Sequence, residues 1–403
     1  MTMAADKQDK VLNVPTLRFP EFKDDWNDYH LRDLCTFHSG GTPSIDNVEY
    51  WEGEIPFVSA VAMHNTHIEK TPLTLTEKGL RDGSKQLEAG NLLLLVRGSM
   101  LWNKIPICYN DVDVAFNQDV KGIVPNSKTT SLFLLNWIQS HENRIKYMVT
   151  GTGIGAGKLD SEDLLALNVK LPSLIEQKKI EKFLSLIDER IETQIRIINE
   201  IQSLISGITQ KISKHSSIRM TMLSELLEER NEKNTALFPV HSVSVSEGVI
   251  NQIDYLGRSF AAADTSHYNV VHRGDIIYTK SPTGEFPFGI VKRNAIESNV
   301  AVSPLYGVYK PISDDVAIYL HYYFCSPLNA QNYLHKLIQK GAKNTINITN
   351  QRFVQNFIPL PDKKTLEGFV KLTTTVSTKL KLEKSLLEKL QKQKRYLLTQ
   401  MFV

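Results

Sequence analysis

The chain has 403 residues, of which 41% are hydrophobic and 23% are charged. This length and composition are typical of a globular protein with two or three domains, each with its own core. The net charge is only +3, so overall basicity gives no indication of a nucleic-acid partner. The cysteines Cys35, Cys108 and Cys325 are widely spaced and include no CxxC pair, which argues against disulfides and structural zinc and favours a reducing compartment.

The beginning of the chain predicts a disordered tail over residues 1–14. Met1–Lys10 is polar and lacks the apolar core of a signal peptide. The longest apolar run, Leu92–Val96, is far too short to cross a bilayer. We therefore expect a cytoplasmic protein with no membrane partner.

Residues 15–172 predict a mostly β domain. Short apolar stretches alternate with turn-forming pairs such as Gly40-Gly41 and Asp82-Gly83. Leu92–Val96 is the best candidate for a buried strand, and residues 132–148 carry apolar residues at helical spacing. Leu171-Pro172 then predicts an extended segment before a helix.

Residues 173–218 predict a long helix with a coiled-coil seam, because aliphatic residues recur at alternating spacings of three and four. If residues 175–212 form one helix, it is about 57 Å long at 1.5 Å per residue. Only one position of the seam is polar. The seam consists of Leu184, Ile187, Ile191, Gln194, Ile198, Ile201, Ile205, Ile208 and Ile212.

Residues 219–361 repeat the order of the first block. Gly274-Asp275 precedes a strand as Gly90-Asn91 does, and Leu360-Pro361 matches Leu171-Pro172. The separation between matching positions drifts only from about 184 to 189 residues, which indicates duplication of a whole domain with its helix.

A second long helix is predicted over residues 362–403, which carry ten basic and four acidic residues. This basic face could meet phosphates or an acidic partner, or it could simply be solvated. Its seam is Leu366, Phe369, Thr373, Val376, Leu380, Glu383, Leu387, Leu390, Lys394, Leu397 and Met401.

The two apolar stripes can be removed from water by packing against each other, and the linking domain favours an antiparallel pair with pseudo-two-fold symmetry. Gln194 and Glu383 both fall near the middle of their helices. We predict that they lie within about one turn of each other and set the register. In the alternative, Gln194 points sideways and Ile195 packs in its place.

Motifs for enzymes fail on inspection. Gly151–Leu159 resembles a phosphate-binding loop, but Thr152 and Leu159 stand where a P-loop needs Gly and Ser or Thr. The segment is either a mobile loop that contacts phosphates through Lys158 and its amides, or a plain connector. His64 and His67 lack a third ligand, so no metal or other cofactor is expected.

Motifs along nearly the whole chain resemble the DNA specificity subunit of type I restriction-modification systems. After Leu360-Pro361, however, the Glu-Gln pair found after Leu171-Pro172 is missing, which predicts a weaker cap on the second helix. The matching segments are Pro15–Phe22 with Trp26, Gly40–Ser44, Tyr50–Val58, Val96–Ser99, Phe116–Gln118, Leu171-Pro172 with Glu176-Gln177 and Ile180, Val243–Ile250, Gly274-Asp275 and Ser303–Tyr306.

This resemblance implies an α+β fold with two mostly β target-recognition domains, at residues 15–172 and 219–361, separated by a pair of long antiparallel coiled-coil helices. Each domain would read one half of a bipartite site in double-stranded DNA. The helices would set the spacer and dock two methyltransferase (modification) subunits, and restriction or motor subunits would complete the complex. The chain itself would perform no chemistry.

Candidate DNA contacts are polar and basic residues in predicted loops, since such side chains read base edges or bind phosphates. Trp102 is included as a stacking or wedge residue. The candidates are Arg97, Ser99, Trp102, Asn103, Lys104, Asn117, Gln118 and Lys158 in the first domain, and Lys280, Ser281, Lys292, Arg293, Lys340, Lys343, Asn344 and Asn347 in the second.

Ile180, Phe183 and Leu186 are candidates for docking the methyltransferase, unless they pack against the chain's own domains. Two other functions remain open. One is a non-enzymatic coiled-coil interaction scaffold without DNA specificity, and the other is an enzyme with an unrecognised site. Salt-dependent binding to duplex DNA would exclude the scaffold, and turnover by the purified chain would be needed for the enzyme.

Overall fold

The computed structural model describes residues 13–153, 155–214, 217–253, 264–340 and 346–403. Nearly all of the expected tail, residues 1–14, lies outside these ranges. The chain forms two compact units: unit 1 runs to Thr193 and includes Leu387–Val403, and unit 2 is Gln194–Leu386. The boundary passes through both long helices, α5 (Leu174–Ile212) and α10 (Lys363–Met401). Each unit therefore contains part of both helices, whereas the sequence suggested separate helical segments.

The core of unit 1 is built on a five-stranded sheet with strand order β2-β11-β7-β9-β4. All four side chains of β7 (Leu92–Leu95) are buried, as predicted for this run. Neighbours in the sheet are antiparallel except the parallel pair β4–β9. The other strands are β2 (Cys35–Ser39), β11 (Val120–Pro125), β9 (Ile107–Asn110) and β4 (His67–Ile68).

Smaller sheets complete unit 1, with orders β5-β3-β10-β6, β12-β13-β8 and β1-β14. Their strands are β1 (Asn27–His30), β3 (Trp51–Val58), β5 (Leu73–Leu75), β6 (Gln86–Leu87), β8 (Arg97–Gly98), β10 (Val114–Phe116), β12 (Thr150–Gly151), β13 (Gly157–Lys158) and β14 (Asn168–Leu171). The described helices before α5 are η1 (Leu31–Asp33), η2 (Val48–Tyr50), η3 (Ala60–Ala62), α1 (Glu77–Gly83), η4 (Ser99–Trp102), α2 (Ser131–Ser140), α3 (Glu142–Lys146) and α4 (Ser161–Leu165).

Unit 2 is built on an antiparallel sheet of order β16-β23-β20-β21, with strand pairs β19-β22, β17-β18, β15-β26 and β24-β25. These are β15 (Ile218–Met222), β16 (Leu227–Glu229), β17 (His241–Ser244), β18 (Gly248–Asn251), β19 (Asn269–Val271), β20 (Ile276–Tyr278), β21 (Val291–Arg293), β22 (Val300–Val302), β23 (Gly307–Pro311), β24 (Gln339–Lys340), β25 (Ile346–Asn347) and β26 (Phe357–Pro361). Its described shorter helices are η5 (Leu223–Glu225), α7 (Asp314–Cys325), α8 (Pro327–His335) and α9 (Asn350–Phe353).

The two units share one topology. The run β2-β11-β7-β9 in unit 1 matches β16-β23-β20-β21 in unit 2, and both are antiparallel throughout. In each unit the first strand pairs with the last strand before a long helix, β1 with β14 and β15 with β26. A short hairpin, β12-β13 or β24-β25, precedes that last strand. The duplication predicted from the sequence is thus present in the strand order.

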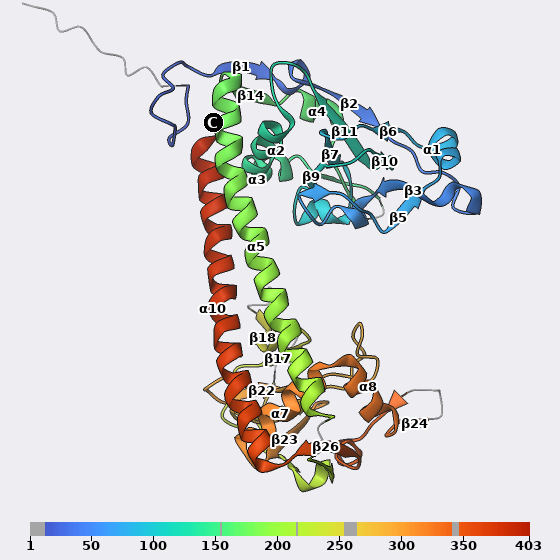
Figure 1. The fold of residues 1–403 in the computed structure, drawn as a ribbon, viewed down its shortest axis with the longest axis vertical. Coiled ribbons are helices and arrows are strands. Elements are labelled where there is room, and N and C mark those ends of the chain that lie inside the picture. The colour runs from blue at the N-terminus through green and yellow to red at the C-terminus, as the bar shows by residue number, and fades with distance from the viewer. Residues whose placement is uncertain (1–12, 154, 215–216, 254–263, 341–345) are drawn as a thin grey trace, which may run out of the picture. The chain divides into compact units, whose positions relative to one another are not determined.

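Within each unit the two long helices pack antiparallel (Figure 1). In unit 1, Ile180 and Leu184 of α5 share a core with Leu397 and Met401 of α10, and Lys394 Nζ lies 2.6 Å from Asp188 Oδ1. In unit 2, Ile208 and Ile212 pack into the same cluster as Leu366 and Phe369. As residue numbers rise along α5, those of the partners fall along α10. The heptad seams therefore bury each other, as expected of an α+β fold with a coiled-coil pair.

The polar seam residues pair as predicted. Gln194 is only 6% exposed, and its Nε2 donates to the main-chain carbonyl of Glu383 at 3.1 Å and also to the Glu383 carboxylate. Ile195 is 41% exposed. The prediction that Gln194 and Glu383 lie within one turn is confirmed, and the alternative in which Ile195 packs is wrong.

The Glu176-Gln177 pair holds the start of α5 against the rest of unit 1. Arg18 donates to both carboxylate oxygens of buried Glu176, through Nε at 2.7 Å and Nη2 at 2.8 Å, and Trp26 Nε1 donates to Oε1 at 3.3 Å. Gln177 Nε2 donates to the main-chain carbonyls of Lys128 and Pro172, at 3.1 and 3.0 Å. These contacts satisfy polar groups that would otherwise be costly to bury.

The second helix has a cap of its own, although the Glu-Gln pair is missing. Asp362 accepts hydrogen bonds from the Thr365 main-chain N–H at 3.0 Å and from its hydroxyl at 2.9 Å. Hydrogen bonds from the Ser217 side chain, and then from Thr365, lower the pKa of Asp362 to about 2. An Asp at the start of a helix can satisfy free N–H groups in place of the missing pair, and the weaker cap on this helix stays a prediction.

No helix among the described residues combines the length and the apolar character that a membrane span requires.

Candidate nucleic-acid interface

The glycine-rich segment of unit 1 is a hairpin and not the mobile loop that we considered. Thr150 pairs with Lys158 and Gly151 with Gly157 in an antiparallel ladder. Strand β13 also pairs with β8, which sets Lys158 opposite Arg97. Two basic side chains that are 61 positions apart in the sequence therefore lie side by side as a cross-strand pair.

Glycine is required at two points of this hairpin. A Cβ on Gly157 would lie 2.8 Å from Val149 Cγ1 and 3.0 Å from Leu101 Cβ, so a side chain there would clash. Gly155 has φ of 81°, in the region that favours glycine. The glycines therefore form a tight hairpin, which explains a pattern that resembled a phosphate-binding loop.

Trp102 covers the tip of the hairpin. It is the last residue of η4, and its Nε1 donates to the main-chain carbonyl of Gly155 at 3.0 Å. Its side chain remains about half exposed. The neighbouring Asn103 accepts a hydrogen bond at its carbonyl from Lys146 Nζ at 2.9 Å, which ties the end of α3 to η4.

The structure thus brings several predicted DNA contacts to one edge of unit 1. We call this edge the hairpin surface; it comprises Arg97, Ser99, Trp102, Asn103, Lys104 and Lys158. All of them except the half-buried Lys104 are exposed.

The basic side chains of the hairpin surface have only distant acidic neighbours. Arg97 Nη1 lies 3.8 Å from Asp119 Oδ1, and Lys158 Nζ lies 3.7 Å from Asp160 Oδ2. Exposed pairs at this separation contribute little to stability. Both cations can therefore exchange these carboxylates for a phosphate at small cost.

Asn117 and Gln118 belong to the turn before β11, beside the hairpin surface. The Asp119 carbonyl accepts from the main-chain N–H of Arg97 at 3.3 Å, which holds the turn against β8. Asn117 Oδ1 accepts from the N–H of Asp119 at 3.1 Å, and exposed Gln118 accepts from the Thr42 hydroxyl at 2.7 Å. Asn117 therefore shapes the turn, whereas Gln118 lies at the surface.

Unit 2 presents exposed residues at the equivalent position. Lys280 and Ser281 follow β20 as Arg97 and Ser99 follow β7, and both are exposed. Lys340 and Asn347 lie in the β24-β25 hairpin, whose backbone alone is described. Lys343 and Asn344 lie outside the described residues.

Lys292 and Arg293 are not in a loop, contrary to the prediction. They lie in β21, where Lys292 is 4% exposed and its Nζ lies 3.3 Å from Cys325 Sγ. Arg293 is largely buried and forms an ion pair with Asp314. Neither side chain is presented to a ligand at the surface, so we remove both from the candidate set.

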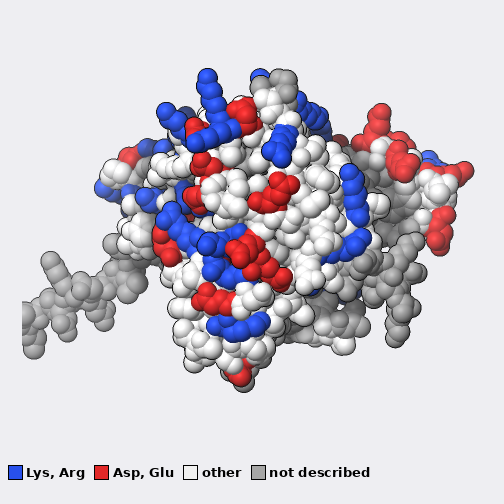
Figure 2. Space-filling view, turned by 90° about the horizontal axis from the view of Figure 1, so that it is seen from below, with Lys and Arg blue, Asp and Glu red and all other residues white. Residues whose placement is uncertain are grey.

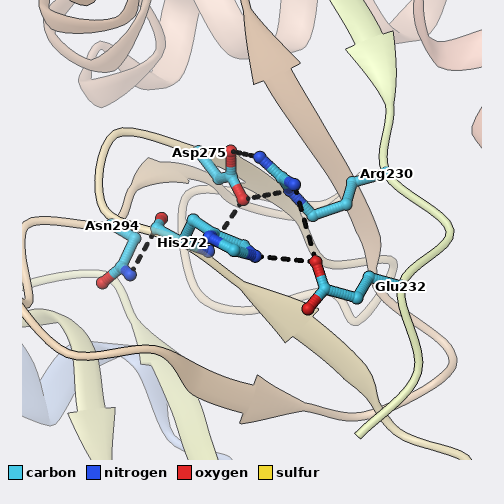
Figure 3. A network of polar contacts seen from close by, with 5 residues as sticks. All are labelled: Arg230, Glu232, His272, Asp275 and Asn294. Atoms are coloured by element: carbon cyan, nitrogen blue, oxygen red, sulfur yellow. Dashed lines mark hydrogen bonds and ion pairs between the residues drawn. The ribbon is translucent and has the colours of Figure 1, made fainter.

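A polar network in unit 2 has a structural role (Figure 3). Arg230 holds buried Asp275 through Nε at 2.7 Å and Nη2 at 3.1 Å, and His272 Nε2 lies 2.7 Å from Glu232 Oε2. Asn294 Nδ2 donates to the main-chain carbonyl of His272 at 3.1 Å. The network fixes the Gly274-Asp275 turn before β20.

No cluster for metal binding occurs within the described ranges: no three His, Cys, Asp or Glu residues are placed to hold an ion. His67 instead faces Asp111, with 3.1 Å between Nδ1 and each carboxylate oxygen. The surface also lacks a single dominant charge on the face shown in Figure 2, where basic and acidic side chains alternate. Any nucleic-acid contact on that face would therefore use dispersed cations.

The candidates for partner docking on α5 divide into buried and exposed residues. Ile180 is 2% exposed and belongs to the core of unit 1, so its proposed docking role is wrong. Phe183 is partly exposed beside the ring of Phe19, and Leu186 is half exposed.

Sequence reasoning missed other exposed positions. Helical spacing shows the seam but not which of the remaining apolar residues meet solvent. Besides Phe183 and Leu186, the exposed large apolar residues on the long helices, within the described part of the chain, are Leu174, Ile175 and Tyr396 in unit 1 and Ile195, Leu204, Leu372, Leu382 and Leu386 in unit 2. Tyr147, at the end of α3, is 92% exposed next to Lys146, and the only signal for it was an aromatic beside a basic residue at a predicted helix end.

The comparisons with known proteins agree with one another. Residues 23–203 match the family model for the type I restriction modification DNA specificity domain. The specificity subunit of the type I restriction enzyme EcoR124I/EcoR124II from Escherichia coli is 25% identical over 215 residues, which cover 53% of this chain and 49% of that protein. The MjaIX specificity subunit of Methanocaldococcus jannaschii is 27% identical over 176 residues, covering 42% and 39%. The chain thus matches about half the length, or less, of these relatives.

The fold agrees over a longer span. The crystal structure of the type I restriction-modification system S subunit from M. genitalium aligns with a TM-score of 0.56 at 15% identity, and covers 97% of this chain and 99% of that one. At this identity the alignment is evidence for the fold. Residues 23–203 therefore match the type I restriction modification DNA specificity domain family, and the chain as a whole has the fold seen in the S subunit from M. genitalium.

Proposed function

We propose that this chain is the specificity subunit of a type I restriction-modification complex and binds double-stranded DNA at a bipartite site, one unit for each half. The observation that carries this proposal is the repeated topology. Both units place an exposed basic residue, Arg97 or Lys280, directly after the equivalent central strand, and both have a hairpin before the last strand. Two such units of different sequence suit two different half-sites.

On the hairpin surface of unit 1, the residues divide by chemistry. Arg97 and Lys158 can bind phosphates, and an Arg can also read guanine in the major groove with two hydrogen bonds. Ser99, Asn103 and Gln118 carry the donors and acceptors that read base edges. The exposed ring of Trp102 suits stacking on a base or insertion between base pairs.

The long helices would set the spacer between half-sites and dock two methyltransferase subunits. Phe183 and Leu186 remain candidates for that contact, joined by the exposed apolar residues Ile175, Leu204 and Leu382. Restriction and motor subunits would complete the complex. We propose that the chain itself is non-catalytic and needs no cofactor, since the methyl donor is used by the methyltransferase.

The test is binding and methylation by the full chain together with its methyltransferase. Sequencing the methylome of cells that carry both proteins should show one bipartite, asymmetric motif, and the same motif should bind in a salt-dependent way. Absence of both would favour the alternative function, a coiled-coil interaction scaffold without DNA specificity.

A further inference from the structure

Unit 2 contains a buried lysine whose side-chain nitrogen faces a sulfur atom. Lys292 is 4% exposed, and its Nζ lies 3.3 Å from Cys325 Sγ. Among the residues that the structure describes, this sulfur is the only hydrogen-bonding or ion-pair partner of the ammonium. A buried ammonium without a counter-ion is strongly unfavourable. The pairing therefore favours the thiolate form of Cys325 over the thiol.

A second donor approaches the same sulfur. The main-chain N–H of Arg293 donates to His321 Nδ1 at 3.3 Å, so Nδ1 carries no proton. The ring proton is then on Nε2, which lies 3.8 Å from Cys325 Sγ. The sulfur accepts from an imidazole N–H and an ammonium, and such donors stabilise a thiolate.

The three cysteines of the chain differ sharply in acidity. Burial alone would raise the pKa of Cys325, but His321 and Lys292 outweigh it and lower that pKa to about 6. Burial raises the pKa of Cys35 and of Cys108 to about 12. At neutral pH only Cys325 is expected to be ionised in the folded chain.

Cys325 differs from the other two cysteines in exposure as well. Cys325 and His321 lie one turn apart at the end of α7, and both are partly exposed, whereas Cys35 and Cys108 are buried in unit 1. Lys292 lies behind them in β21. An ionised sulfur on a partly exposed residue is a feature of reactive cysteines, whereas cysteines buried in apolar surroundings are inert.

We propose that Cys325, held as a thiolate by Lys292 and His321, is a modification site for soft electrophiles, including hydroperoxides. With hydrogen peroxide the thiolate sulfur attacks one peroxide oxygen: an S–O bond forms, the O–O bond breaks, and the second oxygen leaves as hydroxide, which is neutralised to water by a proton from the buffer. The sulfur is oxidised by two electrons to a sulfenic acid, and the peroxide is reduced. This proposal does not depend on the proposed DNA function.

Modification removes the counter-ion of Lys292. A neutral sulfenic acid or thioether leaves the buried ammonium without a negative partner, which destabilises unit 2. Cys325 is the last residue of α7, and α7 contacts α10 through Tyr322 and Ser377. Oxidation is therefore expected to loosen the packing of α7, which links the redox state of one sulfur to the stability of unit 2.

The first experiment measures alkylation of the full, folded chain by iodoacetamide between pH 5 and 9, with each cysteine followed by peptide mass spectrometry. Cys325 should react first, with a half-maximal rate near pH 6, and Cys35 and Cys108 should react only after unfolding. A rate profile for Cys325 centred near the pH of about 8.5 that is typical of a free thiol, or protection of Cys325 in the folded chain, would overturn the proposal.

Variants then test the assigned partners. Lys292→Met and His321→Asn should each shift the rate profile to higher pH, whereas Lys336→Met, which removes an exposed lysine at the end of α8, should leave it unchanged. Circular dichroism checks that each variant is folded. If Lys292→Met does not fold, the rate profiles of His321→Asn and of the wild type still test the proposal. Dimedone should trap a sulfenic acid on Cys325 after peroxide treatment, and its absence would refute the oxidation step.

Discussion

Gln194 and Glu383 form a polar contact between the seams of the two long helices. The amide of Gln194 donates to both the main chain and the carboxylate of Glu383, and Lys379 holds the same carboxylate from one turn away. Hydrogen bonding to Lys379 and then to Gln194 lowers the pKa of Glu383, so the carboxylate stays charged at neutral pH. A slip of α5 against α10 by one turn would leave Gln194 facing aliphatic residues, so this contact selects one register.

Removal of this contact should weaken the helix pair in unit 2. We expect Gln194→Ala to lower the free energy of unfolding by about 1–3 kcal/mol, because a buried acceptor loses its donor. Hydrogen exchange measured by mass spectrometry should show faster exchange in α5 and α10 around these residues. Gln202→Ala, at an exposed position of the same helix, is the control and should change stability by less than about 0.5 kcal/mol. Equal effects of the two substitutions would contradict the role given to Gln194.

Glu176 should be a main determinant of unit 1 stability. Glu176→Gln removes the charge that Arg18 faces, and breaking a buried ion pair from one side costs about 3–5 kcal/mol. All four tryptophans, Trp26, Trp51, Trp102 and Trp137, lie in unit 1. Tryptophan fluorescence during urea unfolding therefore reports this unit. Glu189→Gln, at an exposed position of α5, is the matched control. If Glu176→Gln lowers the free energy of unfolding no more than Glu189→Gln does, the contact of Glu176 with Arg18 does not stabilise unit 1.

Stability should depend on pH through Glu181. It lines a cavity of about 320 Å³ with Asp188, Glu189 and Glu192. Burial raises the pKa of Glu181, although Thr130 donates to its carboxylate and opposes this effect. Folding therefore favours the protonated form, and the stabilisation is present at acidic pH and is lost as the pH rises through the folded-state pKa.

The test of this linkage is Glu181→Gln, which keeps a neutral acceptor for Thr130. The variant should have a higher Tm than the wild type at pH 8, and the difference should disappear near pH 4. A variant that is less stable at pH 8 would show that the ionised carboxylate is favoured after all.

DNA binding by unit 1 should depend on the hairpin surface. Lys158→Ala should weaken binding to all sequences alike and reduce the slope of log K against log salt by about 1, as expected for one phosphate contact. If Arg97 reads a base, Arg97→Ala should relax specificity at one position of the site. Fluorescence anisotropy of the complex with its methyltransferase measures both effects.

Lys128→Ala is the control for these variants. Lys128 follows the end of β11 that lies beside Leu92, the first residue of β7. Arg97 comes after Leu95, the last residue of β7. The two side chains therefore lie at opposite ends of the strands. A loss of affinity on Lys128→Ala equal to that on Lys158→Ala would argue against the hairpin surface.

The long helices should set the spacer of the recognised site. Deleting seven residues from each, 195–201 and 376–382, keeps the heptad phase and shortens the pair by about 10 Å, equal to about three base pairs. Methylome sequencing should then show the same half-sites with a shorter spacer. A same-length variant with alanine at the exposed positions of these segments should keep the wild-type spacer, and an unchanged spacer after deletion would refute the proposal.

The sequence alone determined the repeated elements of this protein. The heptad seams, the buried run Leu92–Leu95 and the duplicated order of strands follow from local periodicity and turn chemistry, which act between near neighbours. The pairing of Gln194 with Glu383 could also be predicted, because two polar residues at matching points of two seams have few alternative partners.

Only the tertiary structure decided which chemically similar residues are buried. Ile180 and Leu186 both look like free apolar positions on α5, yet one is in the core and the other meets solvent. Lys292 and Lys280 look equally exposed in the sequence, but Lys292 faces Cys325 within the fold. The hairpin that unites Arg97 with Lys158 likewise depends on a strand far away in the chain. Burial and pairing of this kind arise from non-local packing, which local patterns do not encode.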